Sequence, residues 1–503
     1  MRKKMRDLYR QIKKNFDKYG LVFLVIIAAG LFLRLYKAET YLPYGHDNDL
    51  ESWIVKDIVI NKHFRLVGQE TSTQGVFIGA LYYYLLVPFY LLAKMQPSGT
   101  IFLSVLLGVF TIWSAYYVFG RLFKKKEIGL IGASIYAIAF YVVMSDRGAV
   151  PTTPVFLWSI WFLYGVGLIF LGRVKKALIL LGVLVSLIWH LIVALVPLTL
   201  VIPAALILSR WKFKLRQVIL GMSAFLVTSI PFFVFEFRHN FQQIRAVGNS
   251  FSSNQGSELS LFEQFKRVMH IFSNIVTNIV WYPQQKYYFL LPLVLVLALV
   301  ILVIKKKMAK NFAAALALWS ILPIIFFTFY SMQVSEYYLN GILVVWIVIL
   351  TLSIYHLFVS KKFRLVGAIL LIVFAYLNMS KFLTYQDSRQ GYIYRKAVVA
   401  EIKRDAQKHG YPCVAVSYIT NPGYDLGYRY FFWLENMHVN RPDSLSPVYT
   451  IVFPLKKIFK EDKTFGALGL IYPDYKRYTK EGVAISCSGA NSNLTDPMFG
   501  YTE

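Results

Sequence analysis

The sequence predicts a mainly α, polytopic membrane helical bundle of about eleven spans, with a small C-terminal extracytoplasmic α/β domain. Three observations lead to this prediction. Hydrophobic residues make up 57% of the 503 residues. Charged residues make up only 16%, whereas a soluble domain carries roughly 25%. Apolar runs of about 20 residues, long enough to cross the hydrocarbon core as helices, recur as far as residue 381.

The chain begins with a basic segment, residues 1–20, in which Lys and Arg recur from Arg2 to Lys18. The first apolar run, Leu21 to Leu35, follows directly and has no small-residue cleavage signal behind it. A cleaved secretory signal would end in such a site. We therefore interpret the run as a retained first span, although an uncleaved signal anchor has the same pattern.

The net charge of +28 would suit a nucleic-acid partner, but its distribution argues against one. Lys and Arg gather in clusters between apolar runs, at Arg121–Lys126, Arg173–Lys176, Arg210–Arg216, Lys305–Lys310 and Lys361–Arg364. The short connections on the alternate side hold only Arg147. Cytoplasmic loops carry such clusters under the positive-inside rule, facing anionic lipid. We expect a multi-pass plasma-membrane protein with a cytoplasmic N-terminal tail, membrane lipid around it and no nucleic-acid partner.

The same charge pattern divides the chain. A transmembrane domain is expected over residues 21–381, with outer loops at 37–75 and 236–286. The apolar stretch Ala177–Leu208 has basic clusters at both ends, so it must be a hairpin of two short helices. The other spans are expected at about 21–36, 101–120, 127–145, 154–171, 217–235, 287–304, 312–330, 337–358 and 364–381.

One apolar segment, Val76 to Ala93, does not fit this alternation. It is long enough to span, and it contains Tyr82, Tyr83, Tyr84 and Tyr90. If it crossed the membrane, every later loop would change sides and the basic clusters would face outward. We therefore interpret residues 76–95 as a re-entrant or interfacial helix at the outer leaflet, where tyrosines are common.

The segment 382–503 changes character and is predicted to be the extracytoplasmic α/β domain. Tyr392–His409 has a charged helical pattern, and strands are expected at Pro412–Thr420, Tyr449–Pro454 and Val483–Cys487, bounded by turn residues. The two cysteines, Cys413 and Cys487, both fall here. Outside the cytoplasm they could form a disulfide, and two unpaired buried thiols are the alternative.

Acidic residues are concentrated in the first outer loop, which reads Tyr44-Gly-His-Asp-Asn-Asp-Leu-Glu-Ser-Trp53. In a helix, Asp47 and Glu51 lie four positions apart on one face. Like charges at that spacing repel one another. The pair therefore suggests a shared cation, substrate or proton, and a solvated amphipathic surface helix is the alternative.

Basic residues follow in the later outer connections. Arg147, in Ser145-Asp-Arg-Gly148, could bind an anion or form a surface cap with Asp146. His190 falls near the outer turn of the predicted hairpin, where a structural histidine is more common than a functional one.

Three further candidates flank outer loops. Arg238 and His239 leave a span end together, which would suit phosphate because guanidinium binds it in a bidentate manner. Anchoring of a helix by snorkelling is the alternative. Tyr338, in Ser335-Glu-Tyr-Tyr338, opens another span, where an aromatic belt is the simpler interpretation.

Over most of residues 15–380 the pattern resembles the C-type (GT-C fold) membrane glycosyltransferases, in the branch of protein O-mannosyltransferases and lipid A aminoarabinose transferases (glycosyltransferase family 39-like). The resemblance rests on the acidic first loop, Gly75–Leu86, the Arg121-Leu-Phe turn, Ser145-Asp-Arg147 and Phe235-Glu-Phe-Arg-His239. It is similar to a bacterial subgroup with an Asp-x3-Asp first loop, and Glu51 stands here in place of the second Asp.

The resemblance implies an enzyme that transfers a sugar, with inversion, from a polyprenyl-phosphate donor to a hydroxyl of a glycan, lipid or protein acceptor on the outer face. It implies Asp47 as general base, with Glu51 orienting substrate or holding a cation. Arg147, His190, Arg238, His239 and Tyr338 would contact donor phosphate or acceptor. No cofactor is certain, and a divalent cation near the two acids stays open. The alternative function is a transporter or flippase of lipid-linked sugars, although ionisable residues gather at one face and no internal repeat is visible.

Overall fold

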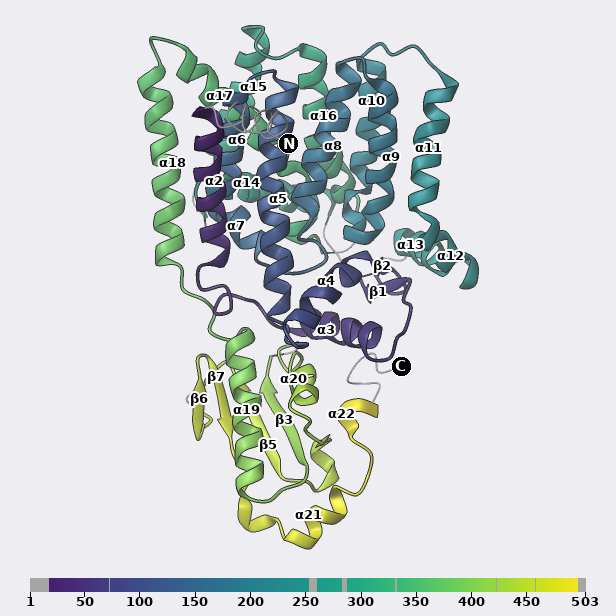
Figure 1. The fold of residues 1–503 in the computed structure, drawn as a ribbon, viewed down its shortest axis with the longest axis vertical. Coiled ribbons are helices and arrows are strands. Elements are labelled where there is room, and N and C mark those ends of the chain that lie inside the picture. Colours follow the sequence, from purple (N-terminus) through teal and green to yellow (C-terminus); the bar gives the residue numbers. More distant parts are fainter. Residues whose placement is uncertain are drawn as a thin grey trace, which may run out of the picture.

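The computed structural model of the chain describes residues 18–71, 73–252, 260–282, 287–330, 333–421, 423–456 and 458–495. It is mainly helical, with a helix bundle at one end and a small sheet at the other (Figure 1). The bundle contains α2 (Lys18–Leu35), α5 (Gly99–Leu122), α6 (Lys126–Ile138), α7 (Phe140–Asp146), α8 (Val155–Phe170), α9 (Val174–Leu191), η1 (Val193–Leu200), α10 (Val201–Leu208), α11 (Leu215–Thr228), α14 (Leu261–Asn278), α15 (Leu290–Ile304), α16 (Lys310–Thr328), η2 (Glu336–Ile342), α17 (Leu343–Val359) and α18 (Arg364–Thr384).

Within the described residues, six helices are long and apolar enough to cross a membrane. Two bent pairs raise this number to as many as eight: α6 with α7, bent by 68°, and α11 with α12 (Ile230–Arg238), bent by 59°. Shorter apolar helices occur at Leu81–Leu92, Val155–Phe170, Val193–Leu208 and Leu290–Ile304. The predicted number of eleven spans stays a prediction, and it would require the last three of these helices, but not Leu81–Leu92, to cross the membrane.

The predicted hairpin of Ala177–Leu208 is present as α9 followed by η1 and α10, which lie beside it (Figure 1). Figure 1 also shows the α10–α11 and α17–α18 connections at the end of the bundle opposite to the sheet. These connections carry the basic clusters Arg210–Arg216 and Lys361–Arg364. The two clusters therefore share one end of the bundle, as the charge alternation requires.

A layer of short elements lies between the bundle and the sheet (Figure 1). It consists of α3 (His46–Val59), the antiparallel hairpin of β1 (Val67–Glu70) and β2 (Phe77–Gly79), and α4 (Leu81–Leu92). Helix α4 thus lies outside the bundle, beside α3. Its Tyr82, Tyr83 and Tyr90 are buried with Trp53 of α3 in one apolar cluster. The interfacial or re-entrant position of residues 76–95 stays a prediction.

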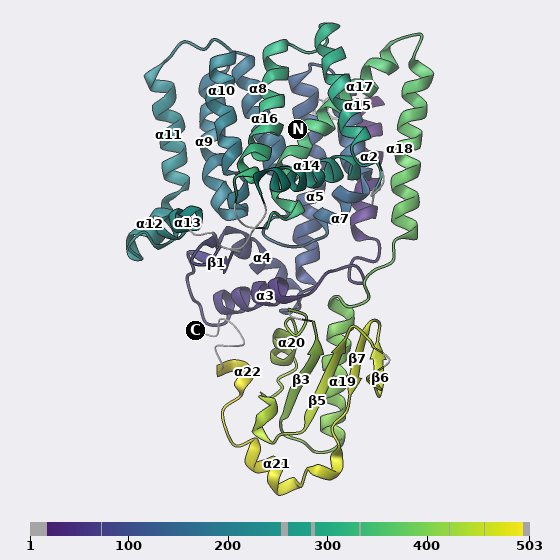
Figure 2. The same ribbon diagram turned by 180° about the vertical axis from the view of Figure 1, so that it is seen from behind.

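The predicted outer loop 236–286 contains structure that we did not expect. After α12, helix α13 (Gln242–Ser252) lies beside the hairpin, and α14 then lies across the bundle, as Figure 2 shows from behind. Helix α14 packs against α16, and its Val268, Ile275 and Val276 belong to the main bundle core. Part of the predicted loop is therefore a core helix.

The C-terminal region is built on α19 (Tyr392–Lys408) and a five-stranded sheet of order β4-β3-β5-β7-β6. Its remaining elements are β3 (Val414–Thr420), α20 (Arg429–Leu434), β4 (Val439–Asn440), η3 (Pro442–Ser444), β5 (Val448–Phe453), β6 (Lys463–Phe465), β7 (Leu468–Ile471), η4 (Tyr475–Arg477), α21 (Lys480–Ser486) and α22 (Ser492–Thr495). Strand β3 is parallel to β4 and β5, and the other pairs are antiparallel.

Two predictions for this region have clear outcomes. The strand expected at Val483–Cys487 is wrong, because Val483 to Ser486 belong to helix α21. Thr479 caps the start of this helix, and its hydroxyl accepts a hydrogen bond from the Gly482 N–H at 3.1 Å. Cys413 and Cys487, whose pairing the sequence left open, form a disulfide. It joins the start of β3 to the end of α21.

Candidate active site

A cavity of about 870 Å³ opens where the bundle meets the layer of short elements. This volume is within the range of about 300–1,000 Å³ that small-molecule sites occupy. Its apolar walls come from the ends of α9, η1 and α16, and its polar wall comes from α3, β1 and the α7–α8 connection. Its lining includes His46, Asp47, Gln69, Glu70, Thr71, Thr73, Ser145, Thr152, Thr153, Trp189, Val193, Val196, Phe326, Phe327, Tyr337, Tyr338 and Asn340.

Asp47 is the exposed acid in the first turn of α3. The helix begins after Gly45, whose backbone is extended and whose N–H donates a hydrogen bond to the Asn48 side-chain oxygen at 3.3 Å. This start places Asp47 in the first turn, where a negative charge is favoured by the helix dipole. Its carboxylate lines the cavity and is accessible to solvent, which is the arrangement that a proton acceptor for a bound molecule requires.

Glu51 lies one turn further along α3 in a very different setting. Its side chain is 1% exposed, and neither carboxylate oxygen has a hydrogen-bond partner among the described residues. Burial, and secondarily the charge of Asp47, raises the pKa of Glu51 well above its ordinary value. Glu51 does not line the cavity. The two acids therefore differ: one is exposed, and the other is buried and favours its neutral form.

The opposite face of α3 is attached to the C-terminal region. Asp49 is buried and accepts hydrogen bonds from the Tyr430 N–H at 3.1 Å and from the Tyr44 hydroxyl at 3.2 Å. Arg429 lies over the ring of Trp53, 4.5 Å from its centre. Burial raises the pKa of Asp49 to about 6, although the Tyr430 N–H and the Arg429 charge both lower it. Helix α20 therefore helps to fix the position of α3.

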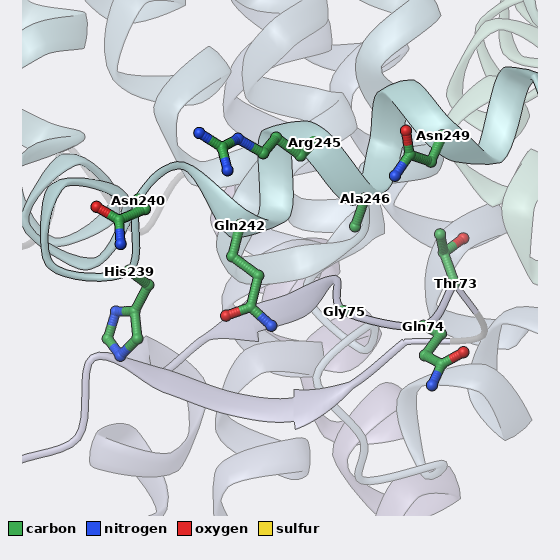
Figure 3. Close-up of a pocket in the computed structure, with 9 residues that line it drawn as sticks. All are labelled: Thr73, Gln74, Gly75, His239, Asn240, Gln242, Arg245, Ala246 and Asn249. Carbon is green, nitrogen blue, oxygen red and sulfur yellow. The ribbon is translucent and has the colours of Figure 1, made fainter.

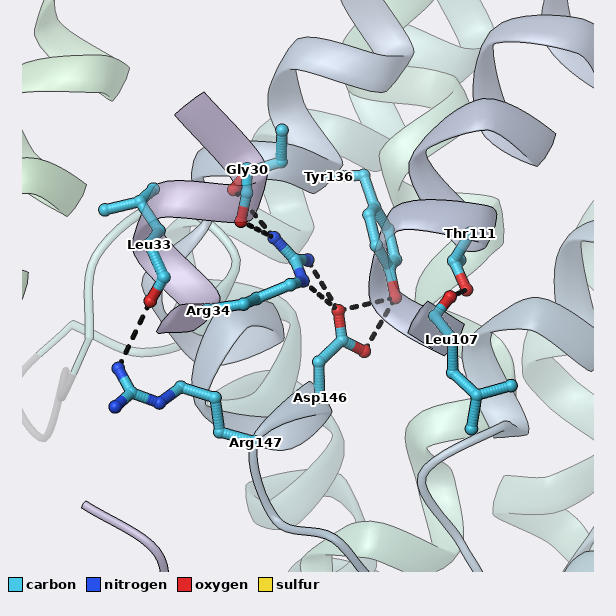
Figure 4. Close-up of polar contacts among 9 residues, drawn as sticks. Gly30, Leu33, Arg34, Leu107, Thr111, Tyr136, Asp146 and Arg147 are labelled. Carbon is cyan, nitrogen blue, oxygen red and sulfur yellow. Dashed lines mark hydrogen bonds and ion pairs between the residues drawn. The ribbon is translucent and has the colours of Figure 1, made fainter. Parts of the chain in front are cut away.

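Arg147 does not line the cavity, and Figure 4 shows its guanidinium directed at Leu33 near the end of α2. Its guanidinium is buried and donates hydrogen bonds to the carbonyl oxygens of Leu33 at 3.2 Å and Tyr36 at 2.8 Å, where α2 ends. The alternative interpretation, a surface cap with Asp146, does not hold either, because Asp146 pairs with Arg34. Arg147 thus holds the end of α2 in place through these hydrogen bonds, and it is not part of the site proposed below.

The ion pair beside it is buried within the bundle. Arg34 Nε donates to Asp146 Oδ2 at 2.9 Å, and the Tyr136 hydroxyl donates to Asp146 Oδ1 at 2.8 Å (Figure 4). Both charged side chains are 3% exposed or less. Arg34 of α2 is held in this way to α6 and α7. The sequence signal for it was an arginine at the end of the first apolar run, which we did not single out.

His190 is also a structural contact. It is buried, and its Nδ1 accepts a hydrogen bond from the Leu81 N–H at 3.4 Å. A Cβ on Gly79 would meet the same nitrogen at 2.2 Å, so glycine allows β2 to approach the imidazole ring. His190 fixes the turn from β2 to α4, while its neighbours Trp189 and Leu191 line the cavity.

The remaining candidates are divided between two cavities. Tyr338 lines the large cavity. His239 lines a second cavity of about 460 Å³ between α13 and the β1–β2 hairpin (Figure 3). Its ring stacks on Phe235, and its Nδ1 donates to the Phe235 carbonyl oxygen at 2.8 Å. Arg238 is exposed and lines neither cavity, so it is not part of the proposed site.

Sequence reasoning did not single out His46. This side chain is exposed, lines the large cavity beside Asp47, and is the one basic residue among the described lining residues. The sequence does show that His46 directly precedes the first candidate acid, Asp47. It does not show that the side chain lines a cavity, which is what distinguishes His46 from other loop histidines.

Asp47 and Glu51 were also considered as cation ligands. Within the described part of the chain, no three His, Cys, Asp or Glu side chains come together in a way that would hold a metal ion. Two carboxylates, one of which does not line the cavity, are a small donor set for a divalent cation, which prefers several charged or carbonyl oxygens. These residues do not fit a resident metal, and we derive no step from one.

No protein-family model matches the sequence, and no curated protein matches it. Among solved structures, ArnT from Cupriavidus metallidurans bound to undecaprenyl phosphate aligns with a TM-score of 0.58 at 12% identity, covering 90% of this chain and 98% of that chain. Its apo state aligns with a TM-score of 0.55 at 11% identity, covering 86% and 92%. An oligosaccharyltransferase from Archaeoglobus fulgidus is more distant, with a TM-score of 0.47 at 12% identity, covering 86% and 65%.

An alignment over nearly all of both chains at such low identity shows a common fold and leaves the activity to be argued from the site. The expected GT-C fold is confirmed: this chain shares the fold of the two ArnT structures.

Proposed function

We propose that this protein is an integral-membrane glycosyltransferase that moves a sugar from a polyprenyl-phosphate donor to an acceptor hydroxyl on the outer face of the membrane, with inversion. The observation that carries the proposal is the position of Asp47, whose exposed carboxylate faces a cavity with apolar walls at one end of the bundle. The solved structure of ArnT with undecaprenyl phosphate supports a lipid-linked donor for this fold.

In the proposed reaction, Asp47 accepts the proton of the acceptor hydroxyl as that oxygen attacks the anomeric carbon. The bond between this carbon and the phosphate oxygen breaks, and the polyprenyl phosphate leaves with the electron pair. Attack from the side opposite to the phosphate inverts the configuration. A positioned general base contributes roughly 10²–10⁴ to such a rate.

Glu51 supports this role by remaining neutral. Its burial and raised pKa favour the protonated form. Only Asp47 of the pair then carries a negative charge, so the donor phosphate meets less repulsion than two carboxylates would cause.

The departing phosphate needs donors and positive charge. His46 is the first residue of α3 and lines the large cavity. Thr152, Tyr337 and Tyr338, which carry hydroxyl groups, line the same cavity. Preorganised hydrogen-bond donors stabilise charge that develops in the transition state. We assign these groups to the donor phosphate, in place of Arg147 and Arg238.

The outer face is proposed from two observations. Helix α3 and strand β1, which contribute residues to the cavity, lie at the end of the bundle that carries the C-terminal sheet, opposite to the connections with the basic clusters Arg210–Arg216 and Lys361–Arg364 (Figure 1). A disulfide, Cys413–Cys487, joins two elements of that region, and disulfides persist in extracytoplasmic compartments.

The test uses purified protein in lipid nanodiscs, incubated with a panel of radiolabelled polyprenyl-phosphate sugars. We expect release of polyprenyl phosphate or sugar transfer by wild type, and none by Asp47→Asn. Asp57→Asn is the matched control, since Asp57 lies on the same helix, does not line the cavity and pairs with Arg65. Turnover by Asp47→Asn at the wild-type rate would contradict the proposal. Saturable donor binding without turnover in every protein would instead favour a transporter of lipid-linked sugars.

A further inference from the structure

The second cavity is a built space between two elements that are distant in sequence. Thr73, Gln74 and Gly75 at the tip of the β1–β2 hairpin form one side, and the segment from His239 to Asn249 forms the other (Figure 3). Its volume of about 460 Å³ is sufficient for a small ligand or one end of a larger one.

A buried polar latch holds the two sides together. The Phe77 N–H donates to Gln243 Oε1 at 2.7 Å, and Gln243 Nε2 donates to Glu236 Oε1 at 3.0 Å. Glu236 is fully buried and Gln243 is 2% exposed. Because α13 is tied to β2 through these groups, the cavity wall is fixed before any ligand arrives.

Carboxamide residues are the largest group in the lining. Gln74, Asn240, Gln242 and Asn249 are four of its nine residues and are exposed to solvent, and no carboxylate is present among the described lining residues. Each carboxamide offers two donor hydrogens and an acceptor oxygen. Sugar hydroxyls both donate and accept, so a set of amides matches a polyhydroxylated ligand.

The charge of the lining is low for a phosphate site. Arg245 supplies one guanidinium, and in Figure 3 it points away from the hairpin, whereas Gln242 and His239 point toward it. Anion sites in proteins use guanidinium groups in bidentate contact with the anion. The geometry therefore favours an uncharged glycan over a phosphate.

The small cavity adjoins the large one. Thr73 lines both, and α13 contributes Val247 to the large cavity and Ala246 to the small one. A glycan held in the small cavity would thus extend past the hairpin toward the space that Asp47 faces.

We infer that this amide-lined cavity binds the neutral glycan portion of the acceptor, so that the acceptor of the proposed reaction is a saccharide or a glycan-bearing molecule. This assignment rests on the proposed transferase function for its role in catalysis. The binding of the glycan itself can be measured without turnover.

The experiment measures binding of fluorescently labelled neutral trisaccharides, with glucose, galactose, mannose or N-acetylglucosamine units, to the full chain in nanodiscs. Gln242→Ala and Asn249→Ala each remove one amide from α13, and Gln74→Ala removes one from the hairpin. Ile244→Ala is the matched control, because Ile244 lies on α13 with its side chain exposed outside the cavity. Each variant is first compared with wild type for monodispersity and thermal unfolding.

We expect at least one trisaccharide to bind wild type and Ile244→Ala equally, and each amide variant about 3- to 10-fold more weakly, the effect of one lost hydrogen bond. Inorganic phosphate should not compete. The inference would be overturned by the absence of trisaccharide binding, by equal affinities in all variants, or by competition from phosphate that is lost in Arg245→Ala.

The Asp47→Asn variant separates the two proposals. It should bind the trisaccharide as wild type does, because Asp47 lies in the other cavity. Glycan binding without donor turnover in wild type would keep the cavity assignment and remove the transferase function. Donor turnover without glycan binding would do the reverse.

Discussion

Replacing Asp49 by Asn should stabilise the protein above neutral pH and leave it unchanged in acid. Asp49 of α3 is buried against α20, and burial raises its pKa from 3.8 to about 6. The folded state therefore binds the Asp49 proton more tightly than the unfolded state does. Stability from this group is fully present below pH 3.8 and is lost as the pH rises through 6.

The magnitude follows from the difference of about 2 between the folded and unfolded pKa values. One pKa unit corresponds to about 1.4 kcal/mol, so the charged Asp49 costs about 3 kcal/mol above pH 6. Asn avoids this cost, and its side-chain oxygen can still accept from the Tyr430 N–H that lies 3.1 Å from Asp49. We expect Asp49→Asn to gain up to about 3 kcal/mol at pH 8.

Thermal unfolding in detergent, followed by intrinsic fluorescence between pH 4 and pH 8, measures this effect. The midpoint of Asp49→Asn should exceed that of wild type by several degrees at pH 8, and the gap should close between pH 6 and pH 4. Asp57→Asn is the control on the same helix, and losing the 3.2 Å contact with Arg65 should lower its midpoint. This reasoning would be refuted if the unfolding midpoint of Asp49→Asn did not exceed that of wild type at pH 8, or if it exceeded it by the same amount at pH 4.5 and pH 8.

Three further predictions concern Glu51, the Arg34–Asp146 pair and the Cys413–Cys487 disulfide. Glu51→Gln should fold normally and keep most of the activity at pH 7, because it preserves the neutral form that burial favours; loss of turnover would show that the Glu51 charge is needed. Arg34→Met should destabilise the bundle by about 3–5 kcal/mol, because it leaves Asp146 charged and without its cationic partner. The further change Asp146→Leu should restore much of the lost stability. Chemical unfolding measures this double-mutant cycle, and additive effects of the two changes would contradict coupling. Cys487→Ser should cost about 4 kcal/mol, since the Cys413–Cys487 bond spans 74 residues, and limited proteolysis should then cleave the C-terminal region faster; an unchanged cleavage rate would exclude this contribution.

The sequence predicted the elements whose periodicity is strong. The apolar runs became the bundle helices, and the charged pattern of Tyr392–His409 became α19. The α14 helix was missed because charged and polar residues interrupt its apolar positions, so the segment has no continuous apolar run. Its start signal was nevertheless present: Ser260 and Glu263 cap each other reciprocally at the helix N-terminus, which is the Ser-x-x-Glu pattern of a capping box.

The candidate site was predicted only in part, for a physical reason. Asp47 was found because its chemistry and its spacing from Glu51 are local properties. The outer cations were grouped by the side of the membrane, and a common side does not fix distance. Arg147 and His190 turned inward to pair with backbone groups, since a buried polar group needs a partner more than it needs a ligand.

Helix α3 has one face toward the cavity and the other against α20, and this shared position has a genetic consequence. A random-mutagenesis screen for loss of activity would return substitutions at Tyr430 or Arg429, far from any substrate, because they shift the helix that carries Asp47. Deleting residues 392–495 would likewise expose the buried ring of Trp53. An inactive truncation would therefore say nothing about whether the C-terminal region recognises the acceptor.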